Sequence, residues 1–282
     1  MFSIEFINMN PTNIIILYLC ACIGSFLNVV IHRYYSKESV VFGSSYCPSC
    51  NEKIKWFDNI PIFSWIFLKG KCRFCSEEIP ISYFLVESFS AYVGFYLFFL
   101  NDSFFISKMK NSWGLELTIL SFFLFSLFLI ITIIDLRSKI IPTRFLLMSG
   151  LVIFLMHFFT ENPSKSLQDG FIGMVLVAGS LALILRIGTF IMKQDAMGWG
   201  DVNMAFVIGF LLGVDYGFFA IAIAIFSGAV FGSGMMLYKR LKNENYRNLE
   251  MPFGPFLAIG TFITFLKGMS SMPFLANFFY GS

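Results

Sequence analysis

Two aspartates stand at the ends of apolar stretches, which makes them the strongest candidates for chemistry. Asp135 closes one stretch in Ile-Ile-Asp-Leu-Arg, and Asp201 opens another in Met-Gly-Trp-Gly-Asp. Ionisable residues at membrane depth are costly and are functional candidates by default. Two carboxyl groups a few ångströms apart cannot both ionise, so one can act as base on a water while the other donates to a carbonyl. The pair predicts aspartic proteolysis. For either residue alone, an Asp solvated by headgroup water is the alternative.

Other residues near these two could support them. Gly198 and Gly200 allow a non-helical turn and a close backbone approach beside Asp201, although glycines that merely interrupt a helix explain them as well. Glu87 lies well inside another apolar stretch, so it needs a polar partner if it is buried. A structural hydrogen bond and a catalytic role both remain open for Glu87.

Four cysteines form two pairs with metal-ligand spacing. The pairs are Cys47-Pro-Ser-Cys50 and Cys72-Arg-Phe-Cys75, with 21 residues between them. Two such turns can close a tetrahedral four-thiolate zinc site. Disulfides are the competing interpretation, and a cytoplasmic position of the loop would disfavour them. Four thiolates leave no open position on the metal, so we expect a structural zinc that staples a loop too small to have its own core.

The composition tells which elements must position these residues. Hydrophobic residues make up 57% of the 282 residues, and charged residues only 13%. The mean hydropathy is +0.76. Soluble domains are about 45–50% apolar and about 25% charged. The composition therefore excludes a soluble enzyme, a disordered chain and a coiled coil, and the continuous apolar runs argue against a membrane β-barrel.

We expect an all-α polytopic membrane protein with about eight transmembrane helices. Most of the apolar stretches reach the roughly 17–25 residues that a bilayer crossing needs. The sixth is short and directly follows the glycines beside Asp201, so it could be tilted, broken or partly re-entrant. The stretches are residues 12–31, 81–100, 115–134, 144–160, 167–192, 202–214, 216–238 and 253–271.

Basic residues predict the orientation. Sixteen of the 20 Lys and Arg fall in one alternate set of loops, residues 33–80, 135–144, 186–200 and 239–250. Loops rich in Lys and Arg face the cytoplasm. We therefore expect the cysteine loop in the cytoplasm and both termini outside. The first stretch lacks a basic n-region and an Ala-x-Ala-like cleavage site, so we interpret it as an anchor.

Taken in order, these motifs resemble the type IV prepilin peptidases, the leader peptidase/N-methyltransferases of bacterial pilus and type II secretion systems. The resemblance runs from about residue 24 to 260. Met197-Gly-Trp-Gly-Asp201 matches the GxGD motif of aspartyl proteases in this family, and Ile141-Pro142 follows Asp135 as in the family. Thr143 and Asn203 differ from the residues usual there. The stretches that carry the resemblance are residues 24–33, 47–75, 81–87, 135–142, 196–202 and 252–256.

The resemblance implies a reaction. A membrane-embedded aspartic endopeptidase would remove the short basic leader of type IV prepilins or pseudopilins at the cytosolic face of the bacterial inner membrane. It would then methylate the new amino terminus with S-adenosylmethionine. Substrate pilins, the lipid bilayer and the pilus or type II secretion machinery are the implied partners, and nucleic acid is not one. A peptidase without methyl transfer is the first alternative, and a membrane transporter is the second.

The resemblance also divides the chain and assigns roles. Residues 1–31 would be the first helix, residues 32–80 the zinc loop with the methyltransferase region, and residues 81–282 the peptidase domain. The methyl-donor site is unknown, and Asn28 and Arg33 are candidates because they lie near that loop. The implied catalytic residues are Asp135 and Asp201, with motif support from Gly198, Gly200, Pro142 and Glu87.

Overall fold

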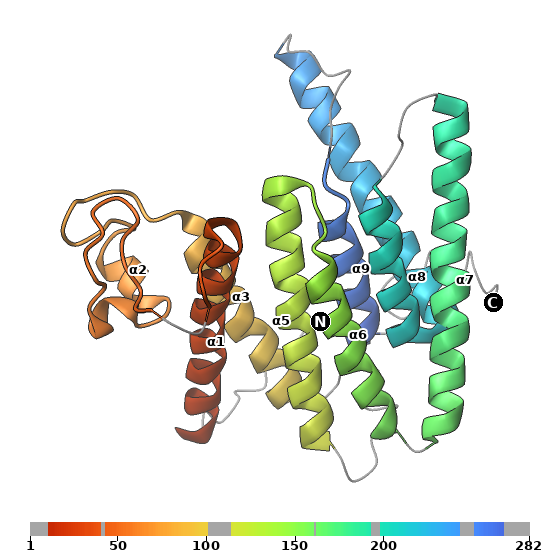
Figure 1. The fold of residues 1–282 in the computed structure, drawn as a ribbon, viewed down its shortest axis with the longest axis horizontal. Coiled ribbons are helices and arrows are strands. Elements are labelled where there is room, and N and C mark those ends of the chain that lie inside the picture. The colour runs from red at the N-terminus through yellow and green to blue at the C-terminus, as the bar shows by residue number, and fades with distance from the viewer. Residues whose placement is uncertain are drawn as a thin grey trace, which may run out of the picture. The chain divides into compact units, whose positions relative to one another are not determined.

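The computed structural model describes residues 11–40, 43–100, 114–160, 162–192, 198–242 and 251–267. The chain divides into two compact units, Met1–Asn101 and Asp102–Ser282, and each is described by itself. Within the described residues there is no β-strand, only two isolated bridges in the cysteine loop. The expected all-α architecture is confirmed (Figure 1).

The first unit consists of two long helices and a loop. Helix α1 (Pro11–Ser36) packs along α3 (Ile81–Phe95), which continues as a short π-helical segment, η2 (Tyr96–Leu100). The two helices approach closely at Gly24, where a Cβ would lie only 2.8 Å from the Cα of Glu87. Only glycine permits this packing. The loop between the helices carries two short helical turns, η1 (Trp56–Asn59) and α2 (Phe63–Phe67).

The described residues of the second unit form a bundle of five helices. Helix α5 is far more buried than α7: 67% of its most apolar 18-residue segment is buried, against 33% for that of α7. Helices α7 and α8 pack most extensively, at glycines where a Cβ on Gly173 or Gly209 would overlap the facing backbone. The helices are α5 (Gly114–Ser138), α6 (Thr143–Phe158), α7 (Pro163–Met192), α8 (Trp199–Leu241) and α9 (Gly254–Lys267).

Helix α8 is two helices joined at a sharp reversal. Gly213 has φ 74° and ψ −166°, a conformation that residues with a side chain rarely adopt. A Cβ on Gly217 would lie 3.5 Å from the Cα of Gly209. In a straight helix, residues eight apart are about 12 Å apart along the axis. The chain therefore folds back at Gly213, as the teal and light-blue parts of α8 show in Figure 1.

A histidine closes this reversal. The Phe210 carbonyl would normally accept from the N–H four residues later, which lies beyond the break. Instead, Nε2 of the buried His157 lies 3.1 Å from that carbonyl oxygen, and its Nδ1 lies 2.6 Å from the Ser166 hydroxyl. His157 thus has a hydrogen-bond partner on each of its two ring nitrogens.

The expected membrane spans are present. Among the described residues, five helices are long and apolar enough to cross a bilayer, and α6 and α9 are shorter apolar helices. The sixth and seventh predicted spans are the two halves of α8. Several buried hydroxyls form hydrogen bonds within their own helix: Ser121, Ser126 and Ser149 donate to the carbonyls four residues earlier.

Candidate active site and metal centre

The cysteine loop contains the same turn twice. The Cys47 N–H donates to the Glu52 carbonyl at 3.0 Å, and the Cys72 N–H donates to the Glu77 carbonyl at 2.8 Å. A bridge flanks each turn, between residues 46 and 53 and between residues 71 and 78. Asn51 and the equivalent Ser76 both have positive φ, near 60°. Each turn therefore presents its two cysteines in the same way.

These turns bring the four sulfurs together. The ligand atoms of Cys47, Cys50, Cys72 and Cys75 all lie within 4.8 Å of one another. The Cys47 and Cys75 sulfurs are 3.8 Å apart, which is far beyond a disulfide bond. A tetrahedron with metal–sulfur bonds of about 2.3 Å has edges of about 3.8 Å. The N–H groups of Cys75 and Phe74 lower the pKa of the Cys72 thiol to about 7. The residues present fit a four-coordinate, thiolate-bound metal ion.

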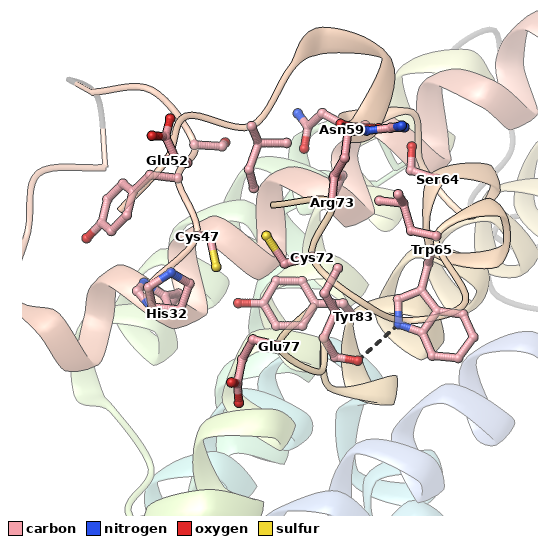
Figure 2. A pocket seen from close by; sticks show the side chains of 18 of the residues that line it. His32, Cys47, Glu52, Asn59, Ser64, Trp65, Cys72, Arg73, Glu77 and Tyr83 are labelled. Carbon is pink, nitrogen blue, oxygen red and sulfur yellow. Dashed lines mark hydrogen bonds and ion pairs between the residues drawn. The ribbon is translucent and has the colours of Figure 1, made fainter. Parts of the chain in front are cut away.

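A cavity of about 340 Å³ lies against this centre, between the loop and helices α1 and α3 (Figure 2). Trp65 forms part of its wall and donates from Nε1 to the Ile79 carbonyl at 3.2 Å. Asp58 and Arg73 form a two-bonded ion pair at 2.5 and 2.8 Å, and the guanidinium lowers the pKa of the Asp58 carboxyl. The cavity has the volume of a site for a small molecule.

The two methyl-donor candidates differ in position. Arg33 lines the cavity, although its guanidinium is buried and donates to the carbonyls of Ser39, at 2.6 Å, and Gly43, at 3.3 Å. The Asn28 amide donates to the Tyr83 carbonyl at 3.1 Å and ties α1 to α3. Asn28 therefore has a structural hydrogen bond, and its assignment to the donor site stays a prediction.

Glu87 reaches from α3 into the loop. Its side chain is 8% exposed, and Oε2 accepts a hydrogen bond from the N–H of Ile62 at 2.7 Å. Ile62 has φ 65° and ψ −55°, and the next N–H, of Phe63, donates to Pro61 at 2.6 Å. This is a γ-turn with positive φ, a strained conformation that is rare for a β-branched residue. The polar partner expected for Glu87 is thus a strained turn.

Asp135 is held by the start of another helix. It lies near the end of α5, is 3% exposed, and its Oδ2 accepts from the Gly254 N–H at 2.9 Å. Gly254 begins α9, so this N–H has no acceptor within its own helix and donates to the carboxylate instead. A Cβ on Gly254 would lie 2.6 Å from Oδ2. No sequence pattern predicts this contact directly, although a Gly-Pro pair is typical of the start of a helix.

Asp201 lies in the first turn of α8. It is 8% exposed, and its carboxylate accepts from the N–H of Gly198, the residue that caps this helix. A Cβ on Gly200 would come within 3.0 Å of the Ile141 side chain, so Gly200 allows the α5–α6 connection to pack against the turn. Pro142 follows, buried, and caps α6. Residues 193–197, with the first part of the expected motif, lie outside the described residues.

The second unit brings the two aspartates together. Asp135 lies near the end of α5 and Asp201 in the first turn of α8, and their carboxyl groups lie close enough to interact electrostatically. Both are buried inside the unit, which lowers the effective dielectric and strengthens their interaction. Two interacting carboxyl groups titrate as a unit, which is the arrangement that lets them share one proton.

Comparison with known proteins identifies the family. The profile of the bacterial peptidase A24 N-terminal domain matches residues 18–101, and that of the type IV leader peptidase family matches residues 122–233. The prepilin leader peptidase/N-methyltransferase of Vibrio cholerae is 33% identical over 212 residues, covering 69% of this chain and 75% of the relative. That of Aeromonas salmonicida is 30% identical over 279 residues, with 88% of each chain covered.

An Escherichia coli type 4 prepilin-like proteins leader peptide-processing enzyme is 30% identical over 264 residues, covering 86% of this chain and 89% of the relative. No solved structure matches significantly. The first profile ends at residue 101, where the first compact unit also ends. The order of motifs, the two profiles and the relatives agree, and the chain belongs to the type IV leader peptidase family.

Proposed function

We propose that this protein cleaves the leader from type IV prepilins or pseudopilins with Asp135 and Asp201, and methylates the new amino terminus. The observation that carries the peptidase half is the burial of two interacting carboxyl groups at the ends of α5 and α8. The relatives' names include both prepilin peptidase and N-methyltransferase activity.

The two aspartates divide the work of peptide hydrolysis. The ionised carboxyl removes a proton from a water, whose oxygen attacks the scissile carbonyl carbon, while the protonated carboxyl donates to the carbonyl oxygen. When the carbon–nitrogen bond breaks, a proton passes from the dyad to the leaving amine. The Gly254 N–H fixes one oxygen of Asp135, and the start of α8 stabilises negative charge on Asp201.

The first unit supplies the remaining parts of the proposal. Zinc is the proposed occupant of the four-cysteine centre, where it holds the loop in place and has no open position for catalysis. The adjacent cavity is the proposed site of S-adenosylmethionine, which supplies a methyl group on a sulfonium sulfur. Trp65 and Tyr83 offer aromatic faces, and Glu52 and Glu77 offer negative charge, which suits a cationic nucleoside.

The proposed orientation follows from the basic loops. It places the cysteine loop and both aspartates at the cytoplasmic face of the bacterial inner membrane and both termini outside. The peptidase residues then lie within residues 81–282, and the loop of residues 32–80 faces the cytosol. A prepilin would present its basic leader there while its apolar helix stays in the bilayer.

Cleavage of a prepilin by purified protein in detergent tests the proposal. Asp135→Asn and Asp201→Asn should each abolish cleavage, because one carboxyl cannot be both acid and base. Asp215→Asn is the matched control, since it removes an exposed Asp from the same helix as Asp201. Methylation of a leaderless peptide should survive Asp201→Asn. Cleavage by either dyad variant, with its fold intact, would refute the assignment.

A further inference from the structure

Among the residues that the structure describes, the buried carboxylate of Glu87 has no positive partner. Asp58–Arg73 is the ion pair found among the described residues, and Glu87 forms none there. Its contacts are the Ile62 N–H and the Ser25 hydroxyl, which are neutral donors. Buried charges in proteins are normally paired, and an ionisable residue in a membrane helix calls for a named partner.

The position of Glu87 points to an external partner. Glu87 lines the cavity with Ser25 and Val29 of α1, so this part of the wall comes from the two membrane helices rather than from the loop. The cavity also borders the cysteine centre and is itself the proposed site of the methyl donor. A group held at Glu87 would therefore sit between the membrane helices and the donor.

The strained turn supports a binding role. Ile62 keeps its positive φ while its N–H is bonded to Glu87, and Ile60 of the same segment lines the cavity. Strained backbone of this kind costs of order 1–3 kcal/mol and concentrates at ligand clamps. The Ile62 N–H occupies one oxygen of the carboxylate and orients the other.

We propose that Glu87 binds the free α-amino group of the processed substrate, an apolar peptide that enters the cavity by its amino terminus. The inference rests on the proposed methyl transfer, because it names where the methyl acceptor is held. An α-ammonium group supplies the positive charge that Glu87 lacks. The same carboxylate oxygen accepts an N–H from the neutral amine, which is the form that can receive a methyl group.

Glu87→Gln tests the charge with little change of shape. The Gln side-chain oxygen can still accept from the Ile62 N–H, so the turn should keep its hydrogen bond. Glu78→Gln is the matched control, because Glu78 lines the same cavity but is exposed. Metal content and unfolding temperature of each full-length variant in detergent report whether the fold is intact.

The probe is a synthetic peptide of about 20 residues, enough to span a bilayer, with the sequence of a mature pilin amino terminus. It is made with a free and with an acetylated amino group, and its Kd is measured by fluorescence anisotropy. Glu87→Gln should weaken binding of the free peptide at least about 30-fold, as removal of one partner of a buried charge pair does. Binding of the acetylated peptide should not change, and Glu78→Gln should bind both like the unmodified protein.

Equal binding of the free peptide by Glu87→Gln and unmodified protein would overturn the inference, and so would an equal loss for both peptides. If Glu87→Gln does not fold, a carbodiimide crosslink in the unmodified protein replaces it. This reagent joins the peptide amine to a nearby carboxyl with loss of water. An adduct at Glu87 supports the inference; an adduct only at another carboxyl, or none, overturns it.

Cleavage and transfer of a labelled methyl group are measured on the same preparations. If Glu87→Gln cleaves, methylates and binds like the unmodified protein, this inference fails while the proposed function stands. If the unmodified protein cleaves but methylates no peptide, the proposed methyl transfer fails instead.

Discussion

Replacing Gly254 with alanine should lower the cleavage activity while the fold stays intact. A Cβ at this position would lie 2.6 Å from Oδ2 of Asp135 and 3.2 Å from its Cγ. Ordinary contact begins at 3.4 Å, so the carboxyl must move by about 0.8 Å, the difference between 3.4 and 2.6 Å. The end of a side chain can make that movement with little cost in stability. The aspartate would then lose its alignment with the start of α9.

A misplacement of about 1 Å in a catalytic group can lower the rate about 100-fold. We therefore expect Gly254→Ala to lower the single-turnover cleavage rate of a prepilin in detergent by roughly that factor, with an unfolding temperature close to that of the unmodified protein. Gly150→Ala is the control, because a Cβ on this helical glycine meets no atom within 4 Å. It should cleave normally. A Gly254→Ala protein that cleaves within about threefold of the unmodified rate would refute the reasoning from this contact.

Three further outcomes follow from the described structure. The purified protein should hold about one zinc per chain, and Cys72→Ser should lower that content because it removes one of four ligands; metal analysis that finds no zinc in folded protein would contradict the site. Gly213→Ala should lower the free energy of unfolding in detergent by about 1 kcal/mol or more, because alanine disfavours φ 74°. An unchanged free energy of unfolding would mean that the backbone at the reversal can adopt another conformation at no cost. A reporter inserted near Lys53 should be cytoplasmic and one fused after Ser282 should be outside, whereas a cytoplasmic carboxyl terminus would mean an odd number of crossings.

Continuous apolar runs and local spacing predicted the helices and the four-cysteine cluster well. The eight stretches correspond to helices because length and hydropathy are properties of the chain itself. The Cys-x-x-Cys turns are equally local, since each turn and its hydrogen bonds lie within eight residues. The short sixth stretch was expected to be broken or tilted, and the reversal at Gly213 is the reason it is short.

Contacts between distant segments could not be predicted in the same way. Asp135 and Gly254 are 119 residues apart, and no local pattern shows that the start of α9 serves that carboxylate. Glu87 and Ile62 meet through a strained turn, and nothing in the type of Ile62 favours a positive φ. Arg33 is a candidate from sequence because it is a charged residue near the loop. Its hydrogen bonds to the carbonyls of residues 39 and 43 could not be predicted, because they depend on how those residues fold around it. The three-part division at residues 31 and 80 stays a prediction.

The reversal in α8 also sets the protonation pattern of His157. A carbonyl oxygen can only accept, so Nε2 facing Phe210 must carry the hydrogen, and Nδ1 is left to accept from the Ser166 hydroxyl. The first half of α8, residues 199–212, is about 21 Å long, less than the roughly 30 Å of hydrocarbon in a bilayer. In the proposed orientation Asp201 lies at one membrane face, and the bend falls short of the other face, within the hydrocarbon, where no bulk water could replace a lost donor. One imidazole tautomer thus connects α6, α7 and α8 at a depth where no solvent donor could take its place.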